Sequence, residues 1–293
     1  MLSSLQSEKK RRELNEKLIK YTLILAAAIS ILTTFGILFS ILFEAIEFFQ
    51  LRSFWYFLTG TIWSPGVANS QFGALPIFAG TFVITIIALL VAIPIGLGSA
   101  IYMSEYASPK FRDYLKPILE ILAGIPTVVY GFFAAITVAP LVVKVAAFFG
   151  LEATFNSALA SGIVMGIMII PLISSLSDDV IRAVPDSQRK AAFALGMTHG
   201  ETIKNIVIPS AMPGIISASL LALSRALGET MIVVMAAGLR PNLSWNPLED
   251  MTTVTVTIVN SLVGDFEFNS PETLSAFALG LVLFIVTLIL NMI

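Results

Sequence analysis

Two opposite charges stand within an apolar stretch, "LSRALGETMIVV", at residues 223–234. Arg225 and Glu229 are four positions apart, so on a continuous helix their side chains would share one face. A charge at the centre of a membrane helix costs about 2.5–3.5 kcal/mol, and such a residue is expected to face a bundle interior or a wet cavity. The arginine offers a planar fork of donors that fits a tetrahedral oxyanion, and the carboxylate could hold that fork between passages or accept a proton. The alternative is a buried ion pair that only locks helices together.

The composition predicts that these charges lie in a membrane. Apolar residues make up 57% of the chain and charged residues only 12%, against about 25% charged in an ordinary soluble domain. Crossing the hydrocarbon core takes about 20 apolar residues in a helix. Runs of that kind lie at residues 21–43, 75–103, 118–143, 157–176, 211–238 and 274–293. We therefore expect an all-α polytopic membrane protein, with six transmembrane helices in a domain at 21–293 after a charged segment at 1–20.

The basic residues predict the orientation, because lysines and arginines that flank spans are retained in the cytoplasm. Thirteen of them precede the first span or lie between spans two and three or four and five: Lys9, Lys10, Arg11, Arg12, Lys17, Lys20, Lys110, Arg112, Lys116, Arg182, Arg189, Lys190 and Lys204. The opposite side receives Arg52, Lys144 and Arg240. The N-terminus is therefore expected in the cytoplasm. The chain ends in mid-span, in "LILNMI", which leaves open whether a short cytoplasmic tail follows.

Two longer connections are expected on the outer side. The first, at residues 44–74, holds Trp55, Tyr56 and Trp63, aromatic residues that suit a membrane interface, and the turn signal "SPG". The second, at 239–273, contains "TTVTVTIV" at 252–259. Its alternation fits a strand, but a short helix is an equal alternative.

The inner segment at residues 178–214 is long and polar and predicts two short helices. Pro185 with Asp186 is a helix-start signal, and Gly196 can end that helix. A second helix can begin at Thr198 or Thr202 and stop before Pro209. The two helices would meet near residues 196–200.

This inner segment resembles the cytoplasmic loop of ABC-importer permeases, which reads Glu-Ala-Ala, three residues, Gly, nine residues, Ile, any residue, Leu, Pro. Ala191, Ala192, Gly196, Ile206 and Pro209 stand at that spacing, with Lys190 in place of the usual Glu and Ile208 in place of Leu. The resemblance implies that residues 178–210, here named the coupling loop, fit a cleft in an ATP-hydrolysing subunit. The contact residues it implies are Ala191, Ala192, Leu195, Gly196, Met197, Thr198, His199 and Gly200. His199 is expected to be an exposed contact, since a metal site needs several converging ligands.

Three further stretches resemble the PstC-type permeases of phosphate importers: "IPIGLGSAIYMSEYA" at 93–107, "LAGIPTVVYGF" at 122–132 and "RALGETM" at 225–231. Similar molybdate and sulfate permeases usually have Phe where this chain has Thr230. The resemblance implies a type I ABC importer permease for inorganic phosphate, with Arg225, Glu229 and Thr230 in the substrate path. It also implies a second, PstA-like permease, a PstB-like dimer of ATP-binding subunits and a PstS-like extracytoplasmic phosphate-binding protein as partners, in a bacterial inner membrane.

The chain lacks the phosphate-binding loop Gly-x-x-x-x-Gly-Lys-Ser/Thr, so ATP hydrolysis is expected on a separate subunit. We expect no enzymatic activity, cofactor or metal in this chain, and membrane lipid but no nucleic acid as a further partner. One alternative is a permease for molybdate or sulfate. Another is an ion-coupled secondary transporter, in which Arg225 and Glu229 would form the substrate or proton site. A passive membrane scaffold would leave these two charges unexplained.

Overall fold

A computed structural model describes residues 2–66, 70–263 and 269–292. Six helical segments in this part of the chain are long and apolar enough to cross a membrane. They are Asn15–Leu51, Leu75–Tyr106, Thr127–Phe148, Ala158–Arg182, His199–Leu227 and Pro271–Met292. The prediction of an all-helical protein with six spans is confirmed.

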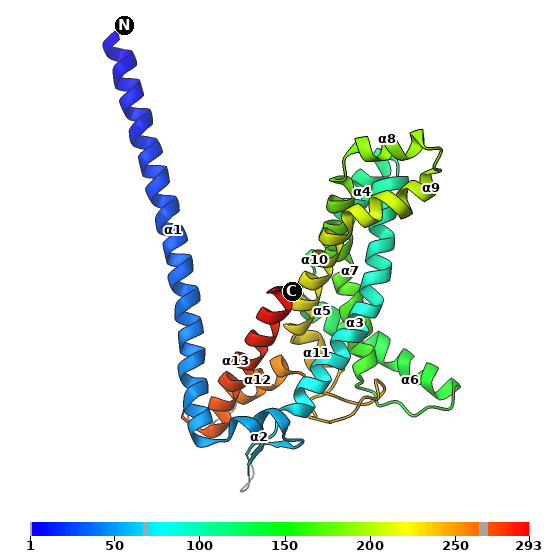
Figure 1. The fold of residues 1–293 in the computed structure, drawn as a ribbon. Helices are drawn as coiled ribbons and strands as arrows, with labels where there is room; N and C mark the ends of the chain where they lie inside the picture. The colour runs from blue at the N-terminus through cyan, green and yellow to red at the C-terminus, as the bar shows by residue number, and fades with distance from the viewer. Residues whose placement is uncertain (1, 67–69, 264–268, 293) are drawn as a thin grey trace.

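Figure 1 shows the arrangement of the helices. Their bounds are α1 Leu2–Leu51, α2 Phe54–Thr59, α3 Leu75–Ile101, α4 Pro109–Gly124, α5 Thr127–Phe133, α6 Ala139–Phe148, α7 Ala158–Arg182, α8 Asp186–Ala194, α9 His199–Thr202, α10 Ile208–Leu227, α11 Met231–Ala236, α12 Val254–Leu262 and α13 Pro271–Met292. Three π-helical segments, η1 Tyr102–Tyr106, η2 Ala134–Val138 and η3 Ile203–Val207, continue α3, α5 and α9. Strands β1 Trp63–Ser64 and β2 Gln71–Phe72 pair antiparallel.

The predicted start of the third span at residue 118 is wrong. That residue belongs to α4, a separate helix that ends at Gly124, and the span begins at Thr127. Pro126 causes the break, because the residue before a proline is disfavoured in the helical region, and Ile125 is extended. Helix α4 is tied to the end of α7 by Arg112 with Asp178 (2.6 Å) and Lys116 with Asp179 (3.1 Å).

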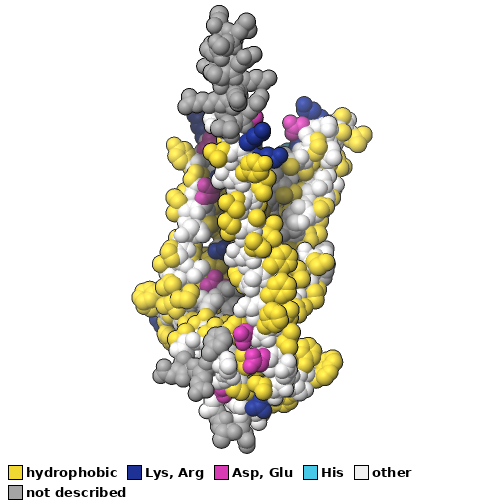
Figure 2. Space-filling model, turned by 90° about the vertical axis from the view of Figure 1, so that its left-hand side faces the viewer, with side chains coloured by type: hydrophobic (Ala, Val, Ile, Leu, Met, Phe, Trp, Pro, Cys, Tyr) yellow, Lys and Arg dark blue, Asp and Glu magenta, His cyan; other side chains and the backbone are white. Residues whose placement is uncertain are grey.

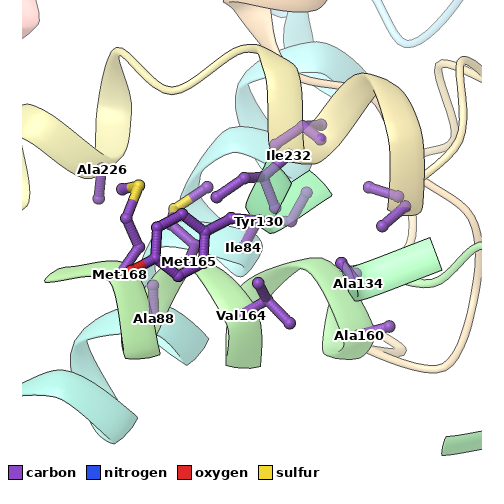
Figure 3. Packing of buried hydrophobic residues seen from close by; sticks show 14 of the residues in the cluster. Ile84, Ala88, Tyr130, Ala134, Ala160, Val164, Met165, Met168, Ala226 and Ile232 are labelled. Carbon is purple, nitrogen blue, oxygen red and sulfur yellow. The ribbon is translucent and has the colours of Figure 1, made fainter. Parts of the chain in front are cut away.

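The centre of the bundle is the packing of α3 against α7. At Gly162 an added Cβ would lie 2.6 Å from Ile87 Cγ2, and at Gly166 it would lie 2.8 Å from the Ala88 carbonyl oxygen. Glycine therefore lets the two helix backbones approach closely, as small residues do at membrane helix contacts. Figure 3 shows the surrounding apolar cluster, in which α5, α10 and α11 contribute Tyr130, Ala226 and Ile232.

Helix α1 stands apart from the bundle along most of its length and packs on α13 near its C-terminal end (Figure 1). None of its most apolar window is buried within the chain. The N-terminus, α4, α8 and α9 lie at one end of the molecule, and α2, α6 and α12 lie toward the other. Hydrophobic side chains cover most of the length of the face seen in Figure 2.

The expected outer connections lie together at the end opposite α8. In the first, the "SPG" turn leads to Gly66 at φ +80 between β1 and β2, and residues 67–69 lie outside the described part. In the second, the stretch at 252–259 enters a helix, α12, and does not form a strand. Residues 264–268 of this connection also lie outside the described part.

Candidate functional site

The charged stretch at residues 223–234 lies at a break between two helices. Helix α10 ends at Leu227, residues 228–230 are not helical, and α11 begins at Met231. The single helix expected at 211–238 is therefore interrupted, and the helix that contains Arg225 runs from His199 to Leu227. Because Glu229 lies beyond the end of that helix, the two charges do not share a helical face.

Glu229 serves as a cap for α11. Its side chain is only 8% exposed, and Oε1 accepts hydrogen bonds from the backbone N–H groups of Met231 (3.1 Å) and Ile232 (3.4 Å). These are amides of the first helical turn, which have no partner within the helix, and the positive end of the helix dipole favours a carboxylate there. Thr255 Oγ1 donates to the Glu229 carbonyl oxygen at 2.8 Å and ties the break to α12.

Arg225 is exposed in the last turn of α10, where the helix dipole favours a cation. Within the described residues its side chain makes no ion pair or hydrogen bond, so the predicted pair with Glu229 is not formed. No group in the described part of the chain therefore occupies its guanidinium donors. Thr230 is half-buried at the start of α11, and its hydroxyl makes no capping bond.

Sequence reasoning missed the residues that hold this break from other segments. Asn291 of α13 donates from Nδ2 to Ser224 Oγ at 2.8 Å, beside Arg225 in sequence. Asn291 carried a usable signal, because a polar residue in an apolar span tends to face other protein groups. Thr255 carried none, since threonine is common in the connection at 239–273.

The coupling loop has the predicted junction between two helices. Helix α8 ends at Ala194, and Gly196 follows at φ +83, in the left-handed region that favours glycine. Thr198, and not Thr202, begins α9 with a capping box, in which Glu201 N donates to Thr198 Oγ1 (3.4 Å) and Thr198 N donates to Glu201 Oε2 (2.8 Å).

The second helix of the loop does not stop before Pro209 as predicted. From His199 it continues through η3 into α10, with Pro209 in the first turn of α10. A proline ring clashes with the carbonyl of residue i−4 in a regular α-helix. The wider π turn just before Pro209 gives that ring room.

Seven of the eight expected contact residues reach the surface. Ala191, Leu195, Gly196, Thr198, His199 and Gly200 are exposed, Met197 is half-buried, and Ala192 is buried. Leu195 is 83% exposed. A groove of about 560 Å³ runs beside it, lined by Ala191, Leu195, Met197, Ile206 and Pro209 among others.

Comparisons with known proteins identify the family. Residues 92–293 match the family described as "Binding-protein-dependent transport system inner membrane component". The chain is 36% identical over 231 residues to the probable ABC transporter permease protein YqgH of Bacillus subtilis, covering 79% of this chain and 73% of that protein. It is 34% identical over 287 residues to the phosphate transport system permease protein PstC of Mesorhizobium japonicum, covering 90% and 84%. The corresponding PstC 1 of Mycobacterium tuberculosis is 33% identical over 267 residues, with 80% and 79% covered.

Solved structures share the fold at low sequence identity. A permease chain of the bacterial alginate ABC transporter, in complex with its pentasaccharide-bound periplasmic protein, matches with a TM-score of 0.62 at 16% identity, covering 96% of this chain and 94% of that one. An inward-facing MetNI methionine ABC transporter chain matches with a TM-score of 0.52 at 16% identity, covering 75% and 90%. The chain belongs to the family of binding-protein-dependent transport system inner membrane components and is a permease of the ABC transporter type.

Proposed function

We propose that this permease moves inorganic phosphate into the cytoplasm as one subunit of an ATP-driven importer. The observation that carries the proposal is Arg225, an exposed guanidinium at a helix break that no carboxylate in the described part of the chain neutralises. The names of the PstC relatives, which align with 80–90% of the chain, support phosphate as the anion.

The chemistry of the break suits an oxyanion. A guanidinium donates two parallel hydrogen bonds to a tetrahedral anion, and such charge-assisted bonds are about twice as strong as neutral ones. The hydroxyl of Thr230, five residues on, makes no capping bond to α11 and can supply a further donor. The Glu229 carboxylate accepts hydrogen bonds from amides of α11, so it does not compete with the anion for the Arg225 guanidinium.

The two ends of the molecule, one with the coupling loop and one with α12, would contact different partners. We infer that a PstB-like dimer of ATP-binding subunits docks on the exposed tip of the coupling loop, around Leu195 and Gly196. A PstA-like second permease would complete the path, and a PstS-like binding protein would deliver phosphate to the end with α12. The basic residues that flank the spans favour a cytoplasmic N-terminus and coupling loop in a bacterial inner membrane.

Transport by the assembled importer in sealed vesicles tests the proposal, with ATP inside and phosphate-loaded binding protein outside. Loss of two charge-assisted hydrogen bonds, at about 1.5–3 kcal/mol each, should lower uptake by Arg225→Met more than about tenfold. Arg225→Lys should be impaired as well, since an ammonium cannot reproduce the fork. Arg240→Met is the matched control, because Arg240 is an exposed arginine in the expected outer segment.

The amount of assembled complex is measured beside uptake, so that loss of transport is separated from loss of folding. Normal phosphate uptake by Arg225→Met at an equal amount of complex contradicts the role of Arg225. Uptake of sulfate or molybdate in preference to phosphate by the wild-type importer contradicts the proposed substrate.

A further inference from the structure

Glu105 is a buried carboxylate where α3 meets the coupling loop. It lies in η1, the π-helical end of α3, and its side chain is 4% exposed. Oε1 contacts Arg189 Nη1 of α8, and Oε2 is 3.7 Å from His199 Nε2 at the start of α9. Each oxygen of one carboxylate thus faces a different helix of the loop.

Arg189 extends this contact to helix α7. Its side chain is 18% exposed, and Nη2 donates to the carbonyl oxygen of Ile181 in the last turn of α7 at 3.0 Å. Nε lies 3.8 Å from Asp186 of α8 itself, whose carboxylate is exposed. The guanidinium therefore joins α8 to the ends of both α3 and α7.

The rings around His199 fix its position beside Glu105. Tyr106 meets the imidazole edge-on with centroids 5.2 Å apart, and Phe193 of α8 stacks on it at 6.3 Å. His199 is therefore held from α3 and from α8 at once. These contacts anchor the start of α9 next to the exposed residues Leu195 and Gly196.

Helix α3 connects this end of the molecule to the helix break. It runs with η1 from Leu75 to Tyr106 without interruption. Near its other end, Thr81 Oγ1 accepts a hydrogen bond from Val254 N at the start of α12 (3.0 Å). Thr255, the next residue, donates to the Glu229 carbonyl oxygen. A displacement of α3 at Glu105 therefore has a continuous route of contacts to the segment after Arg225.

We propose that Glu105 is a positioning residue that ties both helices of the coupling loop to α3, so that movement of the loop by the ATPase is passed to α3 and on to the substrate path. The inference rests on the proposed function. It differs from a purely structural role in one measurable quantity, the number of ATP molecules hydrolysed per anion transported. A carboxylate that only stabilises the fold would change the amount of complex and leave that ratio unchanged.

The test uses the intact importer in sealed vesicles. Glu105→Gln, Arg189→Met and the double variant are compared for assembled complex, ATP hydrolysis and phosphate uptake. The double variant matters most, because it removes both charges together and leaves neither buried alone. The matched control is Asp179→Asn, which removes the partner of Lys116 from an ion pair at the same end of the molecule, where Asp179 is 57% exposed.

We expect the double variant to assemble like wild type but to hydrolyse about 2- to 30-fold more ATP per phosphate, the range seen for substitutions along coupling networks. Glu105→Gln should shift the ratio in the same direction, and Asp179→Asn should not. A wild-type ratio in the assembled double variant would overturn the inference. If the wild-type vesicles take up another oxyanion instead of phosphate, the proposed substrate is wrong, and the ratio for that anion still tests Glu105.

Discussion

Replacing Glu229 should destabilise the permease independently of Arg225. In Glu229→Ala the amides of Met231 and Ile232 lose their acceptor. An unsatisfied buried donor costs about 1–3 kcal/mol, and loss of a negative charge at a helix start costs a further 0.3–1 kcal/mol or so. With two donors affected, we expect a loss of about 2–7 kcal/mol. Glu229→Gln keeps an acceptor oxygen and should lose only about 0.5–2 kcal/mol, the range for a weakened cap.

A double-mutant cycle with Arg225→Met separates a cap from an ion pair. The two side chains share no contact in the structure, so their effects on the free energy of unfolding should add to within about 0.5 kcal/mol. A buried ion pair would behave differently, since either single change would cost about 3–5 kcal/mol and the double change much less than the sum.

Thermal unfolding of the purified importer, followed through the permease, measures the cycle. At about 2.1 cal/mol/K per residue, a chain of 293 residues shifts its Tm by about 1.6 °C per kcal/mol, so Glu229→Ala should lower Tm by roughly 3–11 °C. Arg225→Met should change Tm little while it lowers uptake by more than about tenfold. A coupling energy above about 1 kcal/mol between the two positions would refute the capping role of Glu229.

Other features of the structure lead to three more expected results. Gly196→Ala should lower the free energy of unfolding by about 1–2 kcal/mol and Gly196→Asp by more, because φ +83 disfavours any L side chain. In Gly196→Asp, uptake should fall while membrane insertion persists. A Gly196→Asp importer with its ATPase bound and normal uptake would contradict this. A cysteine at Ser70 should react with an impermeant reagent from outside, and one at Ser187 only after the membrane is opened, each being the sole thiol of the chain; the reverse pattern would overturn the topology. Hydrogen bonds from Ser244, Asn246 and Asn242 hold the pKa of Glu249 below its ordinary value of 4.5. The ionised Glu249 therefore stabilises the segment 242–250 above pH 4.5, and this stability is lost as the pH falls through the lowered pKa. Hydrogen-exchange protection of residues 242–250 should fall over the same pH range in wild type and not in Glu249→Gln.

The six spans could be predicted because length and hydropathy are summed over many residues, and a single break changes neither. The same averaging hid the breaks. Ile125 and Pro126 interrupt an apolar run that reads as one span, and residues 228–230 do the same before α11. The start of α8 and the turn at Gly196 were predictable because caps and left-handed turns depend on a few neighbouring residues.

The site was predictable by residue type but not by geometry. Arg225 was found because a charge in an apolar run is rare, whereas the assumption of a continuous helix gave Glu229 the wrong partner. The contact between Glu105 and Arg189 joins positions 84 apart, and that of Thr255 with Glu229 joins positions 26 apart. No local pattern links such residues, because the packing of α3, α7 and α12 decides which ends meet.

The pairing of α1 with α13 sets an order of events during synthesis. Helix α1 is made well before its partner, since α1 ends at Leu51 and α13 begins at Pro271. At about 5–20 residues per second, α1 waits roughly ten to forty-five seconds for α13 to be made. It can wait in lipid without loss, because a helix satisfies its own backbone hydrogen bonds there. Helices α3 to α11 are therefore made before α1 can pack on α13, and a chain stopped before residue 271 would leave α1 with only the contacts of its C-terminal end, such as those of Phe48 with Phe57 and Phe72.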